Sequence, residues 1–258
     1  MNATDRLFAE VWNRLTADWS RLTTFRKMGV LGEDAARDAM HQSNTYFIQN
    51  QLLHGEHHNF IKNRDQFIRD GMHQKMPQLM TESAVAEFRR TLNASTLVFS
   101  HSILDAAIFD CVRICALAAP AEWSEQLANR KVALGDVAKR PYSEFLSEAI
   151  EIEVSRLERE SLLAKVDRVF QVCRPQKQEY LTTGFRFDRG RLRELDELRH
   201  RVVHAADGSW EFESIEDDMQ FMQSSGLHIF SMVGECFGLV VSGEEAMAAL
   251  AARRASVK

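Results

Sequence analysis

The feature that most constrains this chain is a helical repeat of apolar residues that runs through most of it. Near the N-terminus the repeat covers about five turns of helix and contains Phe8, Val11, Trp12, Leu15, Trp19 and Leu22. Apolar residues spaced three and four apart form one stripe along an α-helix, and that stripe must pack against other elements. Helix breakers are scarce, with 4 Pro and 12 Gly in 258 residues. The sequence therefore predicts an all-α protein with a large buried core.

The few breakers divide the predicted helices. Gly29–Gly32 separate the first helix from a second helical region, and Asp70-Gly71 together with Pro77 mark a boundary. Beyond it, apolar residues between Val85 and Ile103 begin a long helix. We predict three parts, which are a helical N-terminal extension at 1–78, a helical domain at 79–241, and a short C-terminal helix or tail at 242–258.

Charge and composition limit the function classes. The formal net charge is -5 and the isoelectric point is about 6.0. Proteins that coat nucleic acids carry a broad basic surface, so any contact of this chain with RNA must be local. No signal peptide is visible, and charged side chains interrupt the apolar run at Leu97–Ala119, which we interpret as a buried core helix. We expect a cytoplasmic protein without a membrane span.

The cysteines predict neither a disulfide framework nor a metal centre. They are Cys111, Cys115, Cys173 and Cys236, and they lie in apolar helical stretches without paired metal-ligand spacing. We expect reduced thiols packed in the core.

A predicted helix at 191–206 combines residues suited to phosphate chemistry. Its apolar stripe consists of Leu192, Leu195, Leu198 and Val202. At about 100° per residue, Asp196, His200 and His204 fall on the opposite face, with Arg199 on the border between the two. An imidazole exchanges protons near neutral pH, and a guanidinium grips a phosphate with two parallel hydrogen bonds. RNA cleavage can use such a base, acid and positive clamp, and this scheme requires no metal or other cofactor.

Arg199, the polar His200 after it, and His204 resemble the R-X4-6-H motif of the HEPN superfamily, all-helical domains of which many are metal-independent ribonucleases. The upstream chain is also similar, with a long helix around residues 99–110 and a polar helical stretch at Glu158–Leu163. The resemblance covers roughly residues 80 to 240. It implies a HEPN-like helical bundle at 79–241 and a metal-independent endoribonuclease in toxin–antitoxin systems, stress response or anti-phage defence. No tyrosine follows His204 closely, so nucleotide addition by a partner antitoxin is not expected.

The resemblance also implies roles and partners. His204 would be the general acid or base, Arg199 the phosphate clamp, and His200 an orienting or second proton-transfer group. Arg191, Arg193 and Arg201 would bind the RNA substrate, although Arg193 and Arg201 could instead form an ion-pair ladder through Glu197. HEPN proteins typically form homodimers, and an antitoxin or regulatory protein is a further expected partner.

Geometry also favours a dimer. Arg199 and His204 diverge by about 140° on one helix, so a second copy would have to complete the site.

Other interpretations stay open. A non-catalytic HEPN module that dimerises and binds a nucleotide or a partner protein is the leading alternative, and arginines and histidines on a helix surface are often only solvated. Asp105 or Asp110 could orient Arg199, or could simply face solvent. His101 is expected to be a hydrogen-bonded core histidine.

Two further patterns complete the sequence-based expectations. His54, His57 and His58 could share a metal ion with Glu56, but a polar surface is the favoured interpretation. Residues 182–187 and 210–213 could pair as a small hairpin.

Overall fold

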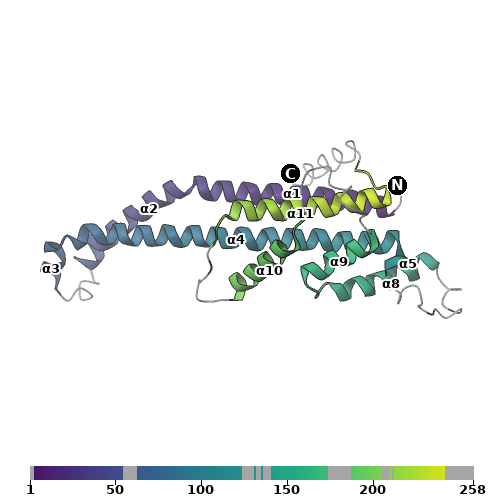
Figure 1. The fold of residues 1–258 in the computed structure, drawn as a ribbon. Helices are drawn as coiled ribbons and strands as arrows, with labels where there is room; N and C mark the ends of the chain where they lie inside the picture. The colour runs from purple at the N-terminus through teal and green to yellow at the C-terminus, as the bar shows by residue number, and fades with distance from the viewer. Residues whose placement is uncertain are drawn as a thin grey trace. The chain divides into compact units, whose positions relative to one another are not determined.

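The computed structural model describes residues 3–54, 63–123, 141–173, 187–204 and 212–241, together with Lys131, Gly135 and Trp210. Within these residues it contains helices and no strand, which confirms the predicted all-α class. The helices, shown in Figure 1, are α1 (Ala3–Leu31), α2 (Glu33–Tyr46), the π-helix η1 (Phe47–Leu52), α3 (Arg64–Arg69), α4 (Met72–Ala118), α5 (Pro120–Trp123), α8 (Tyr142–Leu157), α9 (Leu162–Cys173), α10 (Arg189–His204) and α11 (Ile215–Phe237). Most of the predicted hairpin and the predicted C-terminal helix at 242–258 lie outside the described residues.

The chain forms two compact units, one made of residues 1–21 and 97–258 and the other of residues 22–96. The predicted boundary at residue 78 differs from this division, because α4 continues through Pro77 and contributes to both units. The predicted break at Asp70-Gly71 does separate two helices. Gly71 has a φ of 68°, a left-handed conformation that ends α3 before α4 begins.

In the first unit, α1 and α11 lie side by side (Figure 1). Phe8 of α1 stacks on Phe230 of α11, with 4.0 Å between the ring centroids. The close approach depends on Gly234, because a Cβ atom there would lie 2.7 Å from Cζ of Phe8. Gly226 also lies inside α11. Ser214 caps this helix, because its hydroxyl accepts a hydrogen bond from the backbone N–H of Asp217 at 3.3 Å.

These glycines provide a matched test of packing. Gly234→Ala forces a methyl group against the buried Phe8 ring and should lower the free energy of unfolding by about 1–3 kcal/mol. At Gly226 a Cβ would lie 3.3 Å from the Leu104 side chain, which is a milder overlap, so Gly226→Ala should cost less, because alanine also favours the helix. Urea unfolding of both variants checks this. If both variants lose the same free energy of unfolding, the Phe8 ring moves aside for the added methyl group as readily as the Leu104 side chain does.

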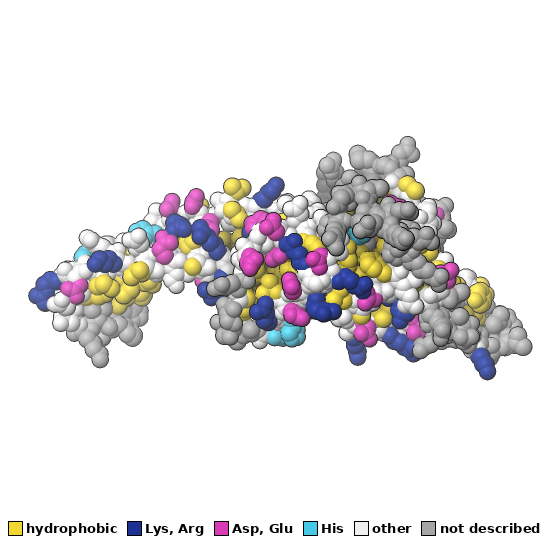
Figure 2. Space-filling model, in the orientation of Figure 1, with side chains coloured by type: hydrophobic (Ala, Val, Ile, Leu, Met, Phe, Trp, Pro, Cys, Tyr) yellow, Lys and Arg dark blue, Asp and Glu magenta, His cyan; other side chains and the backbone are white. Residues whose placement is uncertain are grey.

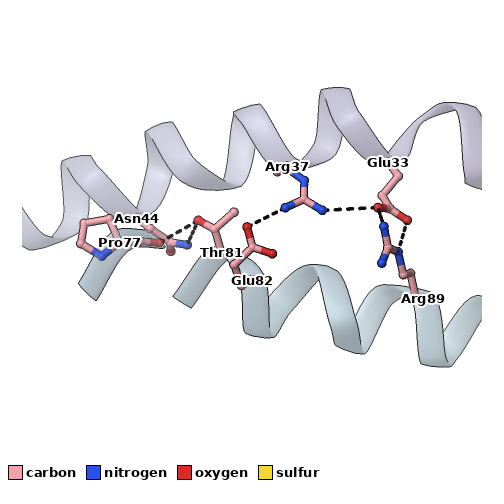
Figure 3. A network of polar contacts seen from close by, with 7 residues as sticks. All are labelled: Glu33, Arg37, Asn44, Pro77, Thr81, Glu82 and Arg89. Atoms are coloured by element: carbon pink, nitrogen blue, oxygen red, sulfur yellow. Dashed lines mark hydrogen bonds and ion pairs between the residues drawn. The ribbon is translucent and has the colours of Figure 1, made fainter. Parts of the chain in front are cut away.

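In the second unit, polar contacts join α2 to the first half of α4 (Figure 3). Glu33 accepts hydrogen bonds from the guanidinium of Arg89, at 2.6 Å from Nε, and lies 3.5 Å from Arg37. The Arg89 hydrogen bond holds the pKa of Glu33 below its usual value. Arg37 also donates to Glu82 at 2.6 Å. The opposite charges therefore alternate between the two helices.

A second contact in this unit surrounds the proline inside α4. The Thr81 hydroxyl donates to the Pro77 carbonyl at 2.8 Å and accepts from the Asn44 amide at 3.1 Å (Figure 3). Thr81 is buried, so these two hydrogen bonds satisfy a polar side chain that would otherwise destabilise the interface. They also tie α2 to the turn of α4 that follows the proline.

Candidate functional site

The helix that carries the motif, α10, is positioned by its cap and by its apolar face. The Asp188 carboxylate accepts hydrogen bonds from the backbone N–H groups of Gly190 at 2.8 Å and Arg191 at 3.1 Å. Leu192 and Leu195 are buried, whereas His200 and His204 are exposed. Two members of the predicted stripe are therefore buried, Leu198 and Val202 are partly exposed, and both histidines lie outside the packed face. Asp196, which the helical spacing placed with the histidines, is only 30% exposed.

Arg199 lies at the border of that face, with about a third of its side chain (32%) exposed. Its Nη2 is 3.5 Å from Oδ1 of Asp196, one turn earlier on α10. Its Nε is buried and has no hydrogen-bond partner among the described residues. The Arg199 guanidinium is thus anchored by its contact with Asp196 while part of it is exposed to solvent. Some of its N–H groups have no hydrogen-bond partner among the described residues.

Asp196 also contacts a buried histidine of α4. Nε2 of His101 lies 2.8 Å from the same Oδ1 atom that faces Arg199. Burial lowers the pKa of His101, the negative charge of Asp196 opposes that shift, and the charge of Arg199 adds to it. The expected core histidine is therefore a neighbour of the motif arginine. The net lowering of its pKa favours the uncharged imidazole.

The acidic residues of α4 do not orient Arg199. Asp105 accepts a hydrogen bond from Nζ of Lys165 on α9 at 2.7 Å, and Lys165 is only 3% exposed. Asp110 is buried and pairs with Arg14 of α1. Neither carboxylate contacts Arg199 among the described residues, because each one forms an ion pair with another helix. Asp110 does not face solvent, whereas Asp105 remains 37% exposed. Asp196 takes the place beside Arg199.

The two histidines of the motif form an exposed pair. Their ring centroids lie 4.4 Å apart, with the planes inclined at 52°. In Figure 2, histidine side chains cluster at the surface in the region that α10 occupies in Figure 1. The His204 ring is therefore next to the His200 ring and open to a ligand from solvent.

The arginines predicted to bind substrate differ in their surroundings. Arg191 lies 3.3 Å from Asp218 and its guanidinium sits 4.7 Å from the Phe221 ring centroid, so it is used in packing α10 on α11. Arg193 and Arg201 are exposed, and neither has an ion pair with Glu197 among the described residues. The alternative of an ion-pair ladder through Glu197 is therefore not seen in that part of the chain, and both cations are exposed.

The described residues contain no cluster of three potential metal ligands. His54 contacts Arg64, with 2.9 Å between Nδ1 and the guanidinium, whereas Glu56, His57 and His58 lie outside the described residues. The four cysteines are free thiols, as predicted. The sequence did not show that Cys115 and Cys173 meet, with their sulfur atoms 3.8 Å apart.

Sequence reasoning missed the contact between His101 and Asp196 and the buried Lys165. A signal for Lys165 was present, because this lysine interrupts the apolar run between Leu162 and Val169. None of the helices in the described part of the chain has the length and apolar character needed to cross a membrane. Comparisons with protein-family models, curated proteins and solved structures return no match for this chain.

Proposed function

We propose that this protein is a metal-independent endoribonuclease of the HEPN type that acts as a homodimer. The observation that carries the proposal is the arrangement on α10, where an anchored, partly exposed Arg199 shares one helix with the exposed His200 and His204. An imidazole that is accessible to substrate can transfer protons near neutral pH, which RNA cleavage by general acid–base catalysis requires. The resemblance of the motif to HEPN ribonucleases supplies the reaction class.

In this proposal His204 takes the proton of the attacking 2′-hydroxyl or gives one to the leaving 5′-oxygen. Arg199 stabilises the negative charge that develops on the phosphorane. His200 orients the reacting groups or performs the second proton transfer. The exposed Arg193 and Arg201 attract the RNA backbone. Arg191 also packs α10 on α11, and the exposed 39% of its side chain adds to the same positive surface.

A second copy completes the proposed site. Arg199 lies against α4 through Asp196 and His101, whereas His204 is exposed in the last turn of α10. One α10 helix therefore presents the two groups in different directions, and a two-fold pairing would bring the arginine of one copy toward the histidine of the other. Toxin–antitoxin or anti-phage defence is the proposed context, with an antitoxin or other regulatory protein as the proposed partner.

The chemistry can be tested with the purified chain and total RNA. Since the 2′-hydroxyl is the nucleophile, cleavage should persist in EDTA, leave 2′,3′-cyclic phosphate or 3′-phosphate ends, and spare DNA of the same sequence. Gel analysis and end-group labelling measure all three. Activity that EDTA abolishes and a divalent ion restores would contradict the mechanism.

A non-catalytic partner-binding module is the second candidate. Val203 lies between the two motif histidines in sequence and is 49% exposed, an apolar side chain suited to a protein contact. A dimer that leaves RNA intact under all the conditions above would favour this function.

A further inference from the structure

His200 and His204 have the arrangement of a bidentate metal chelate. They are one turn apart on α10, both are exposed, and their ring centroids are 4.4 Å apart. Within the described part of the chain, neither ring has a hydrogen bond or ion pair that would have to be broken. The helix backbone fixes the spacing, so little conformational freedom is lost when both rings bind one ion.

We propose that this pair binds a divalent transition-metal ion such as Zn²⁺ or Cu²⁺. Imidazole nitrogens coordinate zinc at about 2.0–2.1 Å, which places two such nitrogens on one ion about 3.3 Å apart. The rings, with centroids 4.4 Å apart, are close enough for side-chain rotation to bring one nitrogen of each to the same ion. Neutral imidazole is a preferred ligand of these ions, whereas Mg²⁺ and Ca²⁺ prefer oxygen ligands.

The position of the pair in the helix favours a cation. His204 is the last residue of α10, where the unpaired carbonyl groups give the helix end a partial negative charge. The described residues provide no third ligand, and the proposed site consists of the two imidazoles with water in the remaining positions. A structural zinc site uses four protein ligands, and this site is therefore exchangeable.

The bound ion would act as an inhibitor. This consequence rests on the proposed function, in which the same imidazoles carry protons during RNA cleavage. A nitrogen that coordinates a metal ion cannot accept or donate a proton, so Zn²⁺ should stop cleavage while Mg²⁺ leaves it unchanged. EDTA would then restore full activity to a preparation that carries zinc.

The site is tested by titrating the 258-residue chain with ZnCl2 in the absence of RNA. Calorimetry or equilibrium dialysis measures the number of zinc ions bound and their affinity. The wild type should bind one more equivalent in the micromolar range than His204→Gln does. A double variant, Arg201→His with His204→Gln, keeps the number of histidines but sets the two rings about 100° apart around the helix, and it should bind at least about tenfold more weakly at this site. Circular dichroism confirms that the variants are folded.

Other histidines and the cysteines contribute equally to all three titrations and cancel in the difference. Identical zinc binding by the wild type and His204→Gln overturns the metal site. Zinc binding that depends on His204 in a protein that cleaves no RNA would contradict the proposed function but uphold the metal site. If the protein cleaves RNA, is not inhibited by zinc, and binds no more zinc than His204→Gln does, the metal site would be contradicted and the proposed function upheld.

Discussion

Arg199→Ala and His204→Ala are each expected to lower RNA cleavage by at least about a hundredfold. A positioned proton-transfer group or charge stabiliser commonly contributes that much to a rate. His204 is exposed, so its loss should leave the free energy of unfolding unchanged, which separates chemistry from folding. Cleavage rates under single-turnover conditions, with thermal unfolding of the same samples, measure both quantities.

Two variants serve as controls for these substitutions. His41→Ala removes another exposed helical histidine, on α2, and should cleave at the wild-type rate. Arg199→Lys keeps the charge but loses the planar fork that binds two phosphate oxygens, so its rate should fall between those of the wild type and Arg199→Ala. Wild-type rates in both alanine variants of the motif would favour the binding module.

Mixing the two inactive variants then tests whether the site is shared between copies. A heterodimer of Arg199→Ala with His204→Ala retains one intact arginine and one intact His204, on different copies. If these two residues meet across the two-fold axis, refolding the variants together should restore a substantial fraction of the activity. A site contained within one copy would give no recovery. Light scattering of the mixture establishes that dimers have formed.

Asp105→Ala is expected to lower the free energy of unfolding by about 3–5 kcal/mol, because it leaves the buried charge of Lys165 without its partner. Lys165→Met should cost far less. The methionine fills similar space, and the carboxylate that remains is 37% exposed and can be hydrated. Urea unfolding of the two variants should therefore show a marked asymmetry between partners of one ion pair.

The exposed pair between Arg113 and Glu151 provides the comparison for that result. Its side chains are 33% and 53% exposed, and Arg113→Ala should change stability by no more than about 1 kcal/mol. Equal losses for Asp105→Ala and Lys165→Met would show that the lysine reaches water once its partner is gone. The predicted difference in stability between Asp105→Ala and Lys165→Met would then be wrong.

The sequence was sufficient for features that depend on local periodicity. The helical stripe predicted that Leu192 and Leu195 are buried and that His200 and His204 are exposed, and the structure places them so. The Ser214 cap was also predictable, because a capping side chain bonds to a backbone group three residues away. Such features need no knowledge of the tertiary fold.

Contacts between helices were not predictable in the same way. Asp196 meets His101 across 95 positions of the chain, and neither residue reveals the other. The partners of Asp105 and Asp110 likewise come from α9 and α1. A carboxylate on an apolar helix indicates that a partner exists, but helix packing decides which partner it is. The role of Arg191 in packing could not be separated from a role in substrate binding for the same reason.

The alternating charges between α2 and α4 select one alignment of these two helices over its neighbours. If α2 moved by one turn, either Arg37 would face Arg89 or Glu33 would face Glu82, depending on the direction. Both shifted alignments place like charges together, which is unfavourable even at an exposed surface. Pairs that contribute little to stability can thus exclude misaligned folded states. Transplanting this helical hairpin into another protein would require all four charges to move together.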